Sequence, residues 1–184
     1  MPERGEHPST MLRHSQELRV PNASLYTPSA EAVASIAGAL ETLLAGDETI
    51  TFGMQAGRLS RAPQRERESA WVGDMAWYLI TDTKLVLEIA VKASPATEGG
   101  WVTVVTRSRR WPLADLRLVE IEETRPPAPN DLSAKVRLGF GGGDVLAIDS
   151  AGIRPLTRGA QDDLRGPEQV TIVREFVARV IGRS

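Results

Sequence analysis

Three arginines beside a tryptophan are the residues whose types and spacing could do chemistry in this chain. Arg107, Arg109 and Arg110 lie directly before Trp111. Guanidinium groups form paired hydrogen bonds with phosphate and carboxylate oxygens, so this stretch could contact an anion or a lipid headgroup. The alternative is a solvated, charge-balanced surface, and the net charge of -2 favours that interpretation.

A second basic stretch contains Arg61, Arg65 and Arg67, which we place in a loop at residues 60–69. Glu66 and Glu68 lie among these arginines and reduce the local charge. Binding of an anionic headgroup would require both arginine stretches to converge on one face of the fold. The absence of a net positive charge also argues against nucleic acid as a partner.

Side chains that most often activate a nucleophile are scarce. The chain has no cysteine, and its two histidines, His7 and His14, fall in a polar N-terminal stretch. Serine and threonine are plentiful, but no Gly-x-Ser-x-Gly motif occurs and no histidine of the predicted folded part could activate a serine. We therefore expect no catalytic residues and no enzymatic activity.

Glycine and carboxylate groupings give no cofactor or metal site. Gly141–Asp144 lacks the spacing and the lysine of a phosphate-binding loop, and a hairpin turn explains it better. A metal or acid–base site needs carboxylates that converge from rigid elements. Three carboxylate pairs stand out, and we expect none to bind a metal: Asp162 with Asp163, Glu122 with Glu123, and Asp144 with Asp149.

Composition sets the class of protein. The 184 residues are 41% hydrophobic and 25% charged, which is typical of a globular chain. Arginine greatly outnumbers lysine, a usage similar to that of GC-rich bacterial genomes; the lysines are Lys84, Lys92 and Lys135. We find neither a membrane-spanning stretch nor a secretory signal and expect a cytoplasmic location.

Period-two patterns predict seven strands between about residues 48 and 149. The clearest is a hairpin within 70–91 that turns at residues 81–84. We expect the other strands at 48–59, at 101–106, within 113–122, at 134–140 and at 145–148, with a turn at 141–144. Loops are predicted at residues 60–69, 94–100, 125–130 and 150–166.

Two helices flank the strands. Apolar residues recur at helical spacing from 29 to 45, including Leu40, Leu43 and Leu44, and from 167 to 182 around Phe176. We expect the first helix to pack on its own sheet; otherwise its leucines would dock on a partner. Residues 1–24 are predicted to be a flexible tail, and residues 25–184 a single domain.

Two segments of the chain resemble a known family. WYLITDTKLV at residues 77–86 resembles the hairpin motif of bacterial pleckstrin-homology-like (PH-like) and GRAM-like domains, and WPLADLRLV at 111–119 resembles their lead into the fifth strand. The order of segments is similar over about residues 48–182, and the helix at 29–45 is an addition. The resemblance implies a seven-stranded, partly open barrel of two orthogonal antiparallel sheets, capped by the C-terminal helix.

The family resemblance implies a binding or scaffolding fold without shared catalytic residues. We therefore expect a non-catalytic protein-interaction or assembly module that binds a protein partner or self-associates through a sheet edge or the first helix, whose leucines are candidate interface residues. The four tryptophans are expected in core or edge packing; if one is instead exposed as an interface anchor, Trp111 is the first candidate. The alternatives are a peripheral binder of anionic lipid headgroups or a small ligand, and an enzyme that uses carboxylates or a metal. Fold alone does not decide between them.

Overall fold

The fold was analysed in a computed structural model, which describes residues 38–44, 48–62, 70–95, 102–156 and 164–182. Only the backbone is described for residues 58–62, 70–72, 93–95, 102–104 and 129. The predicted tail at 1–24 lies outside the described residues, as do Arg65, Arg67, Asp162 and Asp163. No described helix is long and apolar enough to cross a membrane.

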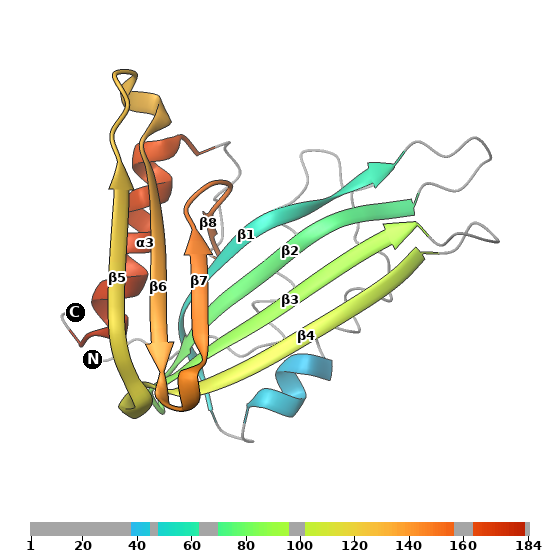
Figure 1. The fold of residues 1–184 in the computed structure, drawn as a ribbon. Helices are drawn as coiled ribbons and strands as arrows, with labels where there is room; N and C mark the ends of the chain where they lie inside the picture. Colours follow the sequence, from blue (N-terminus) through green and yellow to red (C-terminus); the bar gives the residue numbers. More distant parts are fainter. Residues whose placement is uncertain (1–37, 45–47, 63–69, 96–101, 157–163, 183–184) are drawn as a thin grey trace.

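Four long strands form an antiparallel meander, the long sheet (Figure 1). These strands are β1 (Ile50–Ala62), β2 (Ala70–Thr81), β3 (Leu85–Pro95) and β4 (Val102–Pro112), and the short β8 (Arg154–Pro155) pairs with β1. The strand order is β4-β3-β2-β1-β8. The predicted turn between β2 and β3 is confirmed: Lys84 adopts φ 61° and its N–H donates to the Thr81 carbonyl at 3.1 Å.

Three shorter strands form a second antiparallel sheet, the small sheet, in the order β5-β6-β7. They are β5 (Leu116–Thr124), β6 (Ser133–Phe140) and β7 (Val145–Asp149). Three short 3-10 turns lie between the strands: η2 (Leu113–Asp115), η3 (Pro129–Asp131) and η4 (Gly141–Gly143). The predicted turn at residues 141–144 is confirmed, because the Phe140 N–H donates to the Asp144 carbonyl at 2.8 Å.

The C-terminal helix α3 (Gly166–Val180) covers the inner face of the small sheet (Figure 1). Its apolar stripe is buried as predicted from the helical spacing, except for Ile181 just beyond the helix, which is 39% exposed. The helix starts at a glycine because a Cβ at Gly166 would lie 2.2 Å from the Leu132 carbonyl oxygen. This close approach joins the start of α3 to the loop between β5 and β6.

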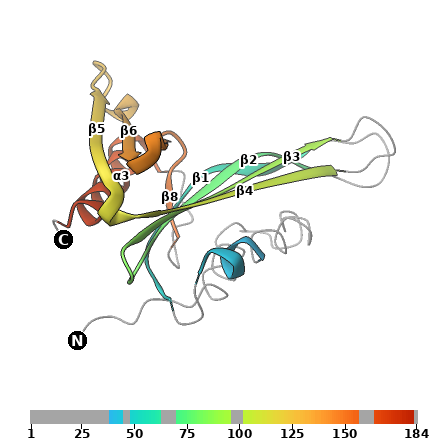
Figure 2. The same ribbon diagram turned by 60° about the horizontal axis from the view of Figure 1, so that its bottom comes forward.

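The long sheet is buried on both faces near its base. One face carries Trp77, Leu79 and Leu87, which pack with the helical segment 38–43, and the other carries Tyr78, Ile80 and Val86, which pack with the small sheet and α3. Figure 2 shows the helical segment and α3 on opposite sides of the long sheet. This burial explains why residues 77–80 form an uninterrupted apolar run instead of alternating with polar residues.

The fold class is thus shown at a coarse level: a mainly β chain with two antiparallel sheets and a C-terminal helix. The two sheets cross at a steep angle in Figure 1, and they do not close into one barrel. The prediction of seven strands missed β8, which lies in the predicted loop at 150–166. Two residues of backbone pairing with β1 leave almost no periodic pattern in the sequence.

Strand lengths were also underestimated. The predicted loop at 60–69 was wrong for residues 60–62, and the one at 94–100 was wrong for 94–95, because β1 and β3 continue through them. The strand predicted at 101–106 continues to Pro112, since every residue from Leu85 to Pro95 in β3 has a partner in β4. Arg107, Arg109 and Arg110 are therefore strand residues.

Candidate functional site

The face of the long sheet that packs on α3 is buried at its base and more exposed farther out. Residues opposite one another on neighbouring strands form cross-strand rows, and in the row at the base Ile80, Val86 and Trp111 are buried. The next row contains Tyr78, Glu88 and Arg109. Beyond it, two further rows line a shallow depression, and we call these two rows the open face. Its inner row is Ala56, Ala76, Ala90 and Arg107, and its outer row is Asp74, Lys92 and Val105, with Arg58, described only in its backbone, opposite Asp74 on β1.

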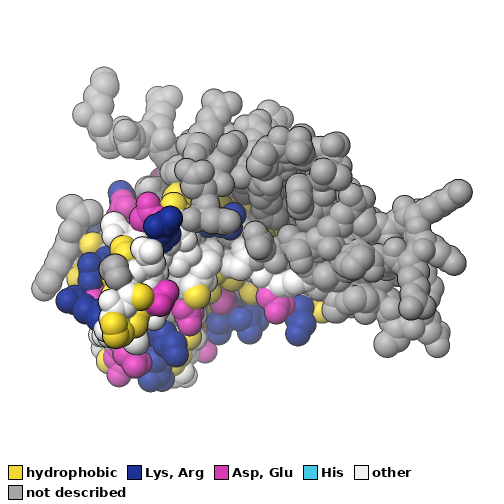
Figure 3. Space-filling view, turned by 90° about the horizontal axis from the view of Figure 1, so that it is seen from above, with side chains coloured by type: hydrophobic (Ala, Val, Ile, Leu, Met, Phe, Trp, Pro, Cys, Tyr) yellow, Lys and Arg dark blue, Asp and Glu magenta, His cyan; other side chains and the backbone are white. Residues whose placement is uncertain are grey.

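The open face is a shallow depression with an apolar floor and a charged rim. The alanines of its inner row are half-buried and form the floor, whereas Val105 stands 56% exposed at the side of β4. Lys92 lies opposite Asp74 across β2 and β3. Figure 3 shows basic side chains close to acidic ones over the described surface, with hydrophobic side chains between them. Such a surface suits a protein partner better than a deeply enclosed small molecule.

A buried carboxylate separates the open face from the core. Glu88 of β3 is only 3% exposed, and its Oε2 accepts a hydrogen bond of 2.6 Å from Arg109 Nε. Its Oε1 accepts a longer contact of 3.4 Å from an Arg107 terminal nitrogen. Burial, with a further contribution from Glu88, raises the pKa of Tyr78 to about 12 and keeps its hydroxyl neutral at physiological pH.

Trp111 is buried, as expected for core packing, and the alternative of an exposed interface residue was wrong. Its side chain is 4% exposed, it stacks on Phe140 with ring centroids 5.1 Å apart, and its Nε1 donates to Asp144 at 3.2 Å. The guanidinium of Arg109 lies 4.9 Å above the Trp111 ring. The arginines that precede Trp111 made it look solvent-facing, but alternate residues of a strand face opposite sides and stacking holds the indole in the core.

The three predicted arginines do not converge. Arg107 and Arg109 lie on the α3 side of β4 and share Glu88. Arg110 projects to the other side, where its terminal nitrogen donates to the Leu43 carbonyl at 2.8 Å. Of the second basic stretch, Arg61 is described only in its backbone and the rest lies outside the described residues.

The leucines of the first helix pack on their own sheet, as the sequence predicts. Leu40 is 1% exposed and belongs to the cluster around Trp77, with Leu43 and Leu44 packed against that cluster. The described part of the helix is 38–43, and its predicted N-terminal portion lies outside the described residues. These leucines are therefore largely committed to the chain itself.

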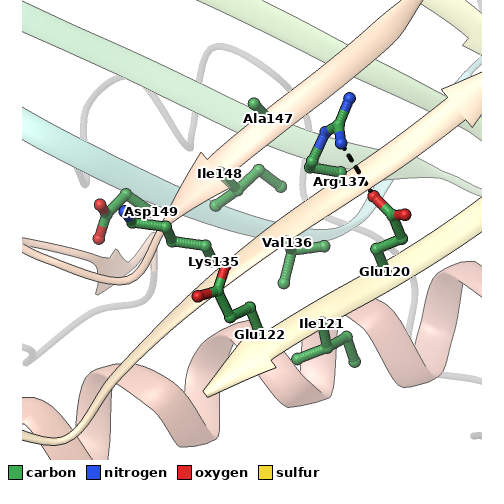
Figure 4. Close-up of a pocket in the computed structure, with 9 residues that line it drawn as sticks. All are labelled: Glu120, Ile121, Glu122, Lys135, Val136, Arg137, Ala147, Ile148 and Asp149. Atoms are coloured by element: carbon green, nitrogen blue, oxygen red, sulfur yellow. Dashed lines mark hydrogen bonds and ion pairs between the residues drawn. The ribbon is translucent and has the colours of Figure 1, made fainter. Parts of the chain in front are cut away.

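The outer surface of the small sheet carries a second depression with paired charges (Figure 4). Arg137 donates to Glu120 at 3.1 Å, and Lys135 lies between Glu122 and Asp149 in the strand register. Each cation therefore has a carboxylate neighbour, and the arrangement leaves no concentrated charge to attract an ion. We interpret it as a solvated, salt-bridged surface.

Three of the carboxylates considered as metal ligands in the sequence, Glu123, Asp144 and Asp149, form hydrogen bonds within the fold. Glu123 accepts hydrogen bonds from Arg174 of α3, and these lower its pKa, whereas Glu122 points to the outer surface. Asp144 accepts from Trp111, and Asp149 caps the Ala151 N–H at 2.9 Å. Among the residues that the structure describes, no three histidine, cysteine, aspartate or glutamate side chains are grouped to hold a metal ion.

Sequence reasoning overlooked Glu88 and Val105, which define the two sides of the open face. Glu88 interrupts an otherwise apolar strand, and an interrupting charge in a buried strand indicates a paired partner on the neighbouring strand. That pattern could have indicated the ion pair with Arg109. Comparison of the chain with protein-family models, curated proteins and solved structures found no match.

Proposed function

We propose that this chain is a non-catalytic protein-interaction or assembly module with a PH-like fold. A four-stranded meander, a three-stranded meander and a C-terminal helix follow one another in the order that the resemblance implies. The motif at residues 77–86 forms the β2–β3 hairpin, and the motif at 111–119 leads from β4 into β5. These positions support the PH-like assignment, although the two sheets stay separate.

The observation that carries the proposal is the open face. The solvated face of an antiparallel sheet is normally polar, whereas the open face has a floor of alanines inside its charged rim. Here β2, β3 and β4 continue through the open face, with Val105 56% exposed. A protein partner on this surface would bury Val105 and the alanine floor.

The alternative of an anionic-headgroup binder gains no support from the site. It requires the arginines to act together, whereas Arg110 contacts the first helix on the opposite side from Arg107 and Arg109. Arg109 is further held by Glu88 and Trp111. Among the side chains that the structure describes, the open face has Arg107 beside an apolar floor and Lys92 opposite Asp74, which fits a protein surface better than a phosphate-rich membrane.

Site-specific photo-cross-linking in the cells that make the protein tests the proposal. A photoreactive amino acid replaces Val105 in one variant and Thr171, an exposed residue of α3, in a matched control. We expect an adduct heavier than the 20.0 kDa chain from position 105 and none from position 171. The absence of an adduct at 105, or equal adducts at both positions, would contradict an interaction role for this face.

A further inference from the structure

β4 is an edge strand of the long sheet, because β3 pairs with it on one side and no described strand pairs with it on the other. Edge strands direct backbone N–H and C=O groups outward from alternate residues, which allows another extended chain to add to the sheet. The strand is eleven residues long, from Val102 to Pro112. It therefore offers a long template beside the open face.

The charge on this edge is of one sign. β4 contains Arg107, Arg109 and Arg110 and no acidic residue. Antiparallel pairing of two β4 strands would bring the arginines of two copies into one narrow zone, and like charges across a strand pair are destabilising. The same charge attracts an acidic strand, so complementarity favours a partner over a second copy.

Arg107 is the arginine best placed to meet such a partner. Its side chain is 62% exposed, and its contact with Glu88 is 3.4 Å long, compared with 2.6 Å for Arg109. If Arg107 turned outward to an incoming carboxylate, Glu88 would keep Arg109 and stay paired in its buried position. Glu88 would give up only the longer of its two contacts, and Arg107 would gain the incoming carboxylate in exchange.

Val105 completes the pattern on the same face of β4, two residues before Arg107. In an antiparallel strand, a residue opposite Arg107 is followed two positions later by the residue opposite Val105. These two positions would select an acidic residue and then an apolar one, separated by a single residue. Such cross-strand pairs add selectivity to the backbone hydrogen bonds between the two strands.

We propose that the outer edge of β4 binds an extended segment of a partner protein by strand addition, with an acidic residue opposite Arg107 and an apolar residue opposite Val105. This inference deepens the proposed function and rests on it, because it names the chemistry of the partner segment. Arg107 then acts as the residue that selects acidic segments, and the main chain of β4 supplies hydrogen bonds that any sequence could make.

Titration of the isotopically labelled full chain with two peptides tests the proposal by nuclear magnetic resonance. The probe is an eight-residue strand-forming peptide with glutamate–threonine–valine at its centre, and lysine replaces the glutamate in the control peptide. We expect saturable shifts of the β4 amide signals with the glutamate peptide, at a dissociation constant below about 1 mM. The lysine peptide should leave these signals unchanged.

Two matched variants assign the effect to one side chain. The side chains of Arg107 and Arg137 are 62% and 60% exposed and each contacts a glutamate, but Arg137 lies on the central strand of the small sheet. Arg107→Ala should weaken binding of the glutamate peptide about two- to fivefold, the loss expected for one cross-strand ion pair, and Arg137→Ala should not change its binding. Arg107→Glu should reverse the preference and bind the lysine peptide.

Four results would overturn strand addition: no saturable binding, equal binding of both peptides, an unchanged affinity in Arg107→Ala, or signal shifts that do not include the β4 amides. If Val105 still forms its specific cross-link in cells, such a result removes the strand mechanism and leaves the interaction module standing. If that cross-link is also missing, the proposed function fails as well. Binding to phosphatidylserine vesicles that Arg107→Ala abolishes would overturn the proposal in favour of a membrane surface.

Discussion

Arg109 donates a hydrogen bond of 2.6 Å from Nε to Oε2 of Glu88, and this ion pair joins β4 to β3 where the covered part of the long sheet meets the open face. The carboxylate is buried, and the Arg109 side chain is 32% exposed. A buried carboxylate is costly unless it is paired. The pair therefore determines which arginine stays in the fold and which one, Arg107, remains available at the surface.

Glu88→Gln should lower the free energy of unfolding by about 1–3 kcal/mol, because a buried charge-assisted hydrogen bond becomes a neutral one. Urea denaturation measures the loss. Glu120→Gln is the matched control, since its pair with Arg137 is exposed on both sides and should contribute less than about 1 kcal/mol. Equal losses in the two variants would show that Glu88 is not held as the structure indicates.

Leu40→Ala should destabilise the chain by about 2–5 kcal/mol, because the side chain fills the cluster around Trp77 and its removal leaves a cavity. Glu41→Ala, an exposed change in the same helical segment, should alter stability by no more than about 0.5 kcal/mol. Thermal or urea unfolding provides the comparison. If Leu40→Ala left stability unchanged, the helix would not be packed on its own sheet and its leucines would again be candidates for a partner.

Tyr78 should make the fold sensitive to alkaline pH. Its pKa is raised from the usual value of 10.0 to about 12, because burial penalises the phenolate and Glu88 adds repulsion. The folded state thus holds the proton more tightly than the unfolded state, so this stability is complete below pH 10 and is lost as the pH rises through 12. Tyr78→Phe should remove that alkaline loss, which unfolding curves at several pH values measure; Tyr26 remains as the other tyrosine.

Glu123 should make the attachment of α3 sensitive to acid. Hydrogen bonds from Arg174, then from Arg125, lower the pKa of Glu123 below its usual value of 4.5. The stability that this group contributes is present above pH 4.5 and is lost as the pH falls through its lowered pKa. Glu123→Gln should flatten the acid limb of the stability curve.

The control for Glu123 is Glu175→Gln, because Glu175 pairs with Arg179 inside α3 and joins no two elements. The free energy of unfolding of Glu175→Gln should fall at acid pH in the same way as that of the unmodified chain. Identical acid limbs for the two variants would contradict a role for Glu123 in holding α3 to β5.

Much of the fold could be predicted because its patterns are local. The turn at 81–84, the glycine turn at 141–144 and the stripe on α3 each depend on residues close in the sequence. The continuation of β4 through Arg107 and Arg109 could not, because it depends on Glu88 about twenty residues earlier. A polar segment can be predicted as a strand only when the residues opposite it on the neighbouring strand are known.

The candidate site was predicted only in part for a related reason. Sequence spacing identified the arginines but grouped all three, whereas strand alternation sends Arg110 to the first helix and away from the other two. Trp111 looked like a surface residue beside charges, and its stacking partner Phe140 lies on the small sheet. The open face itself depends on where the covering layer ends, which no local pattern encodes.

The solution mass of the chain, purified under mild conditions from the cells that make it, tests the central claim most directly. Light scattering measures the solution mass of the wild type and of the double variant Val105→Lys, Arg107→Glu. The mass shows whether the chain is bound to a partner or free. We predict a wild-type mass above the 20.0 kDa of one chain, and a folded variant at 20.0 kDa. A wild-type mass of 20.0 kDa, or a larger mass that the double variant retains, would contradict an interaction surface on the open face and the β4 edge.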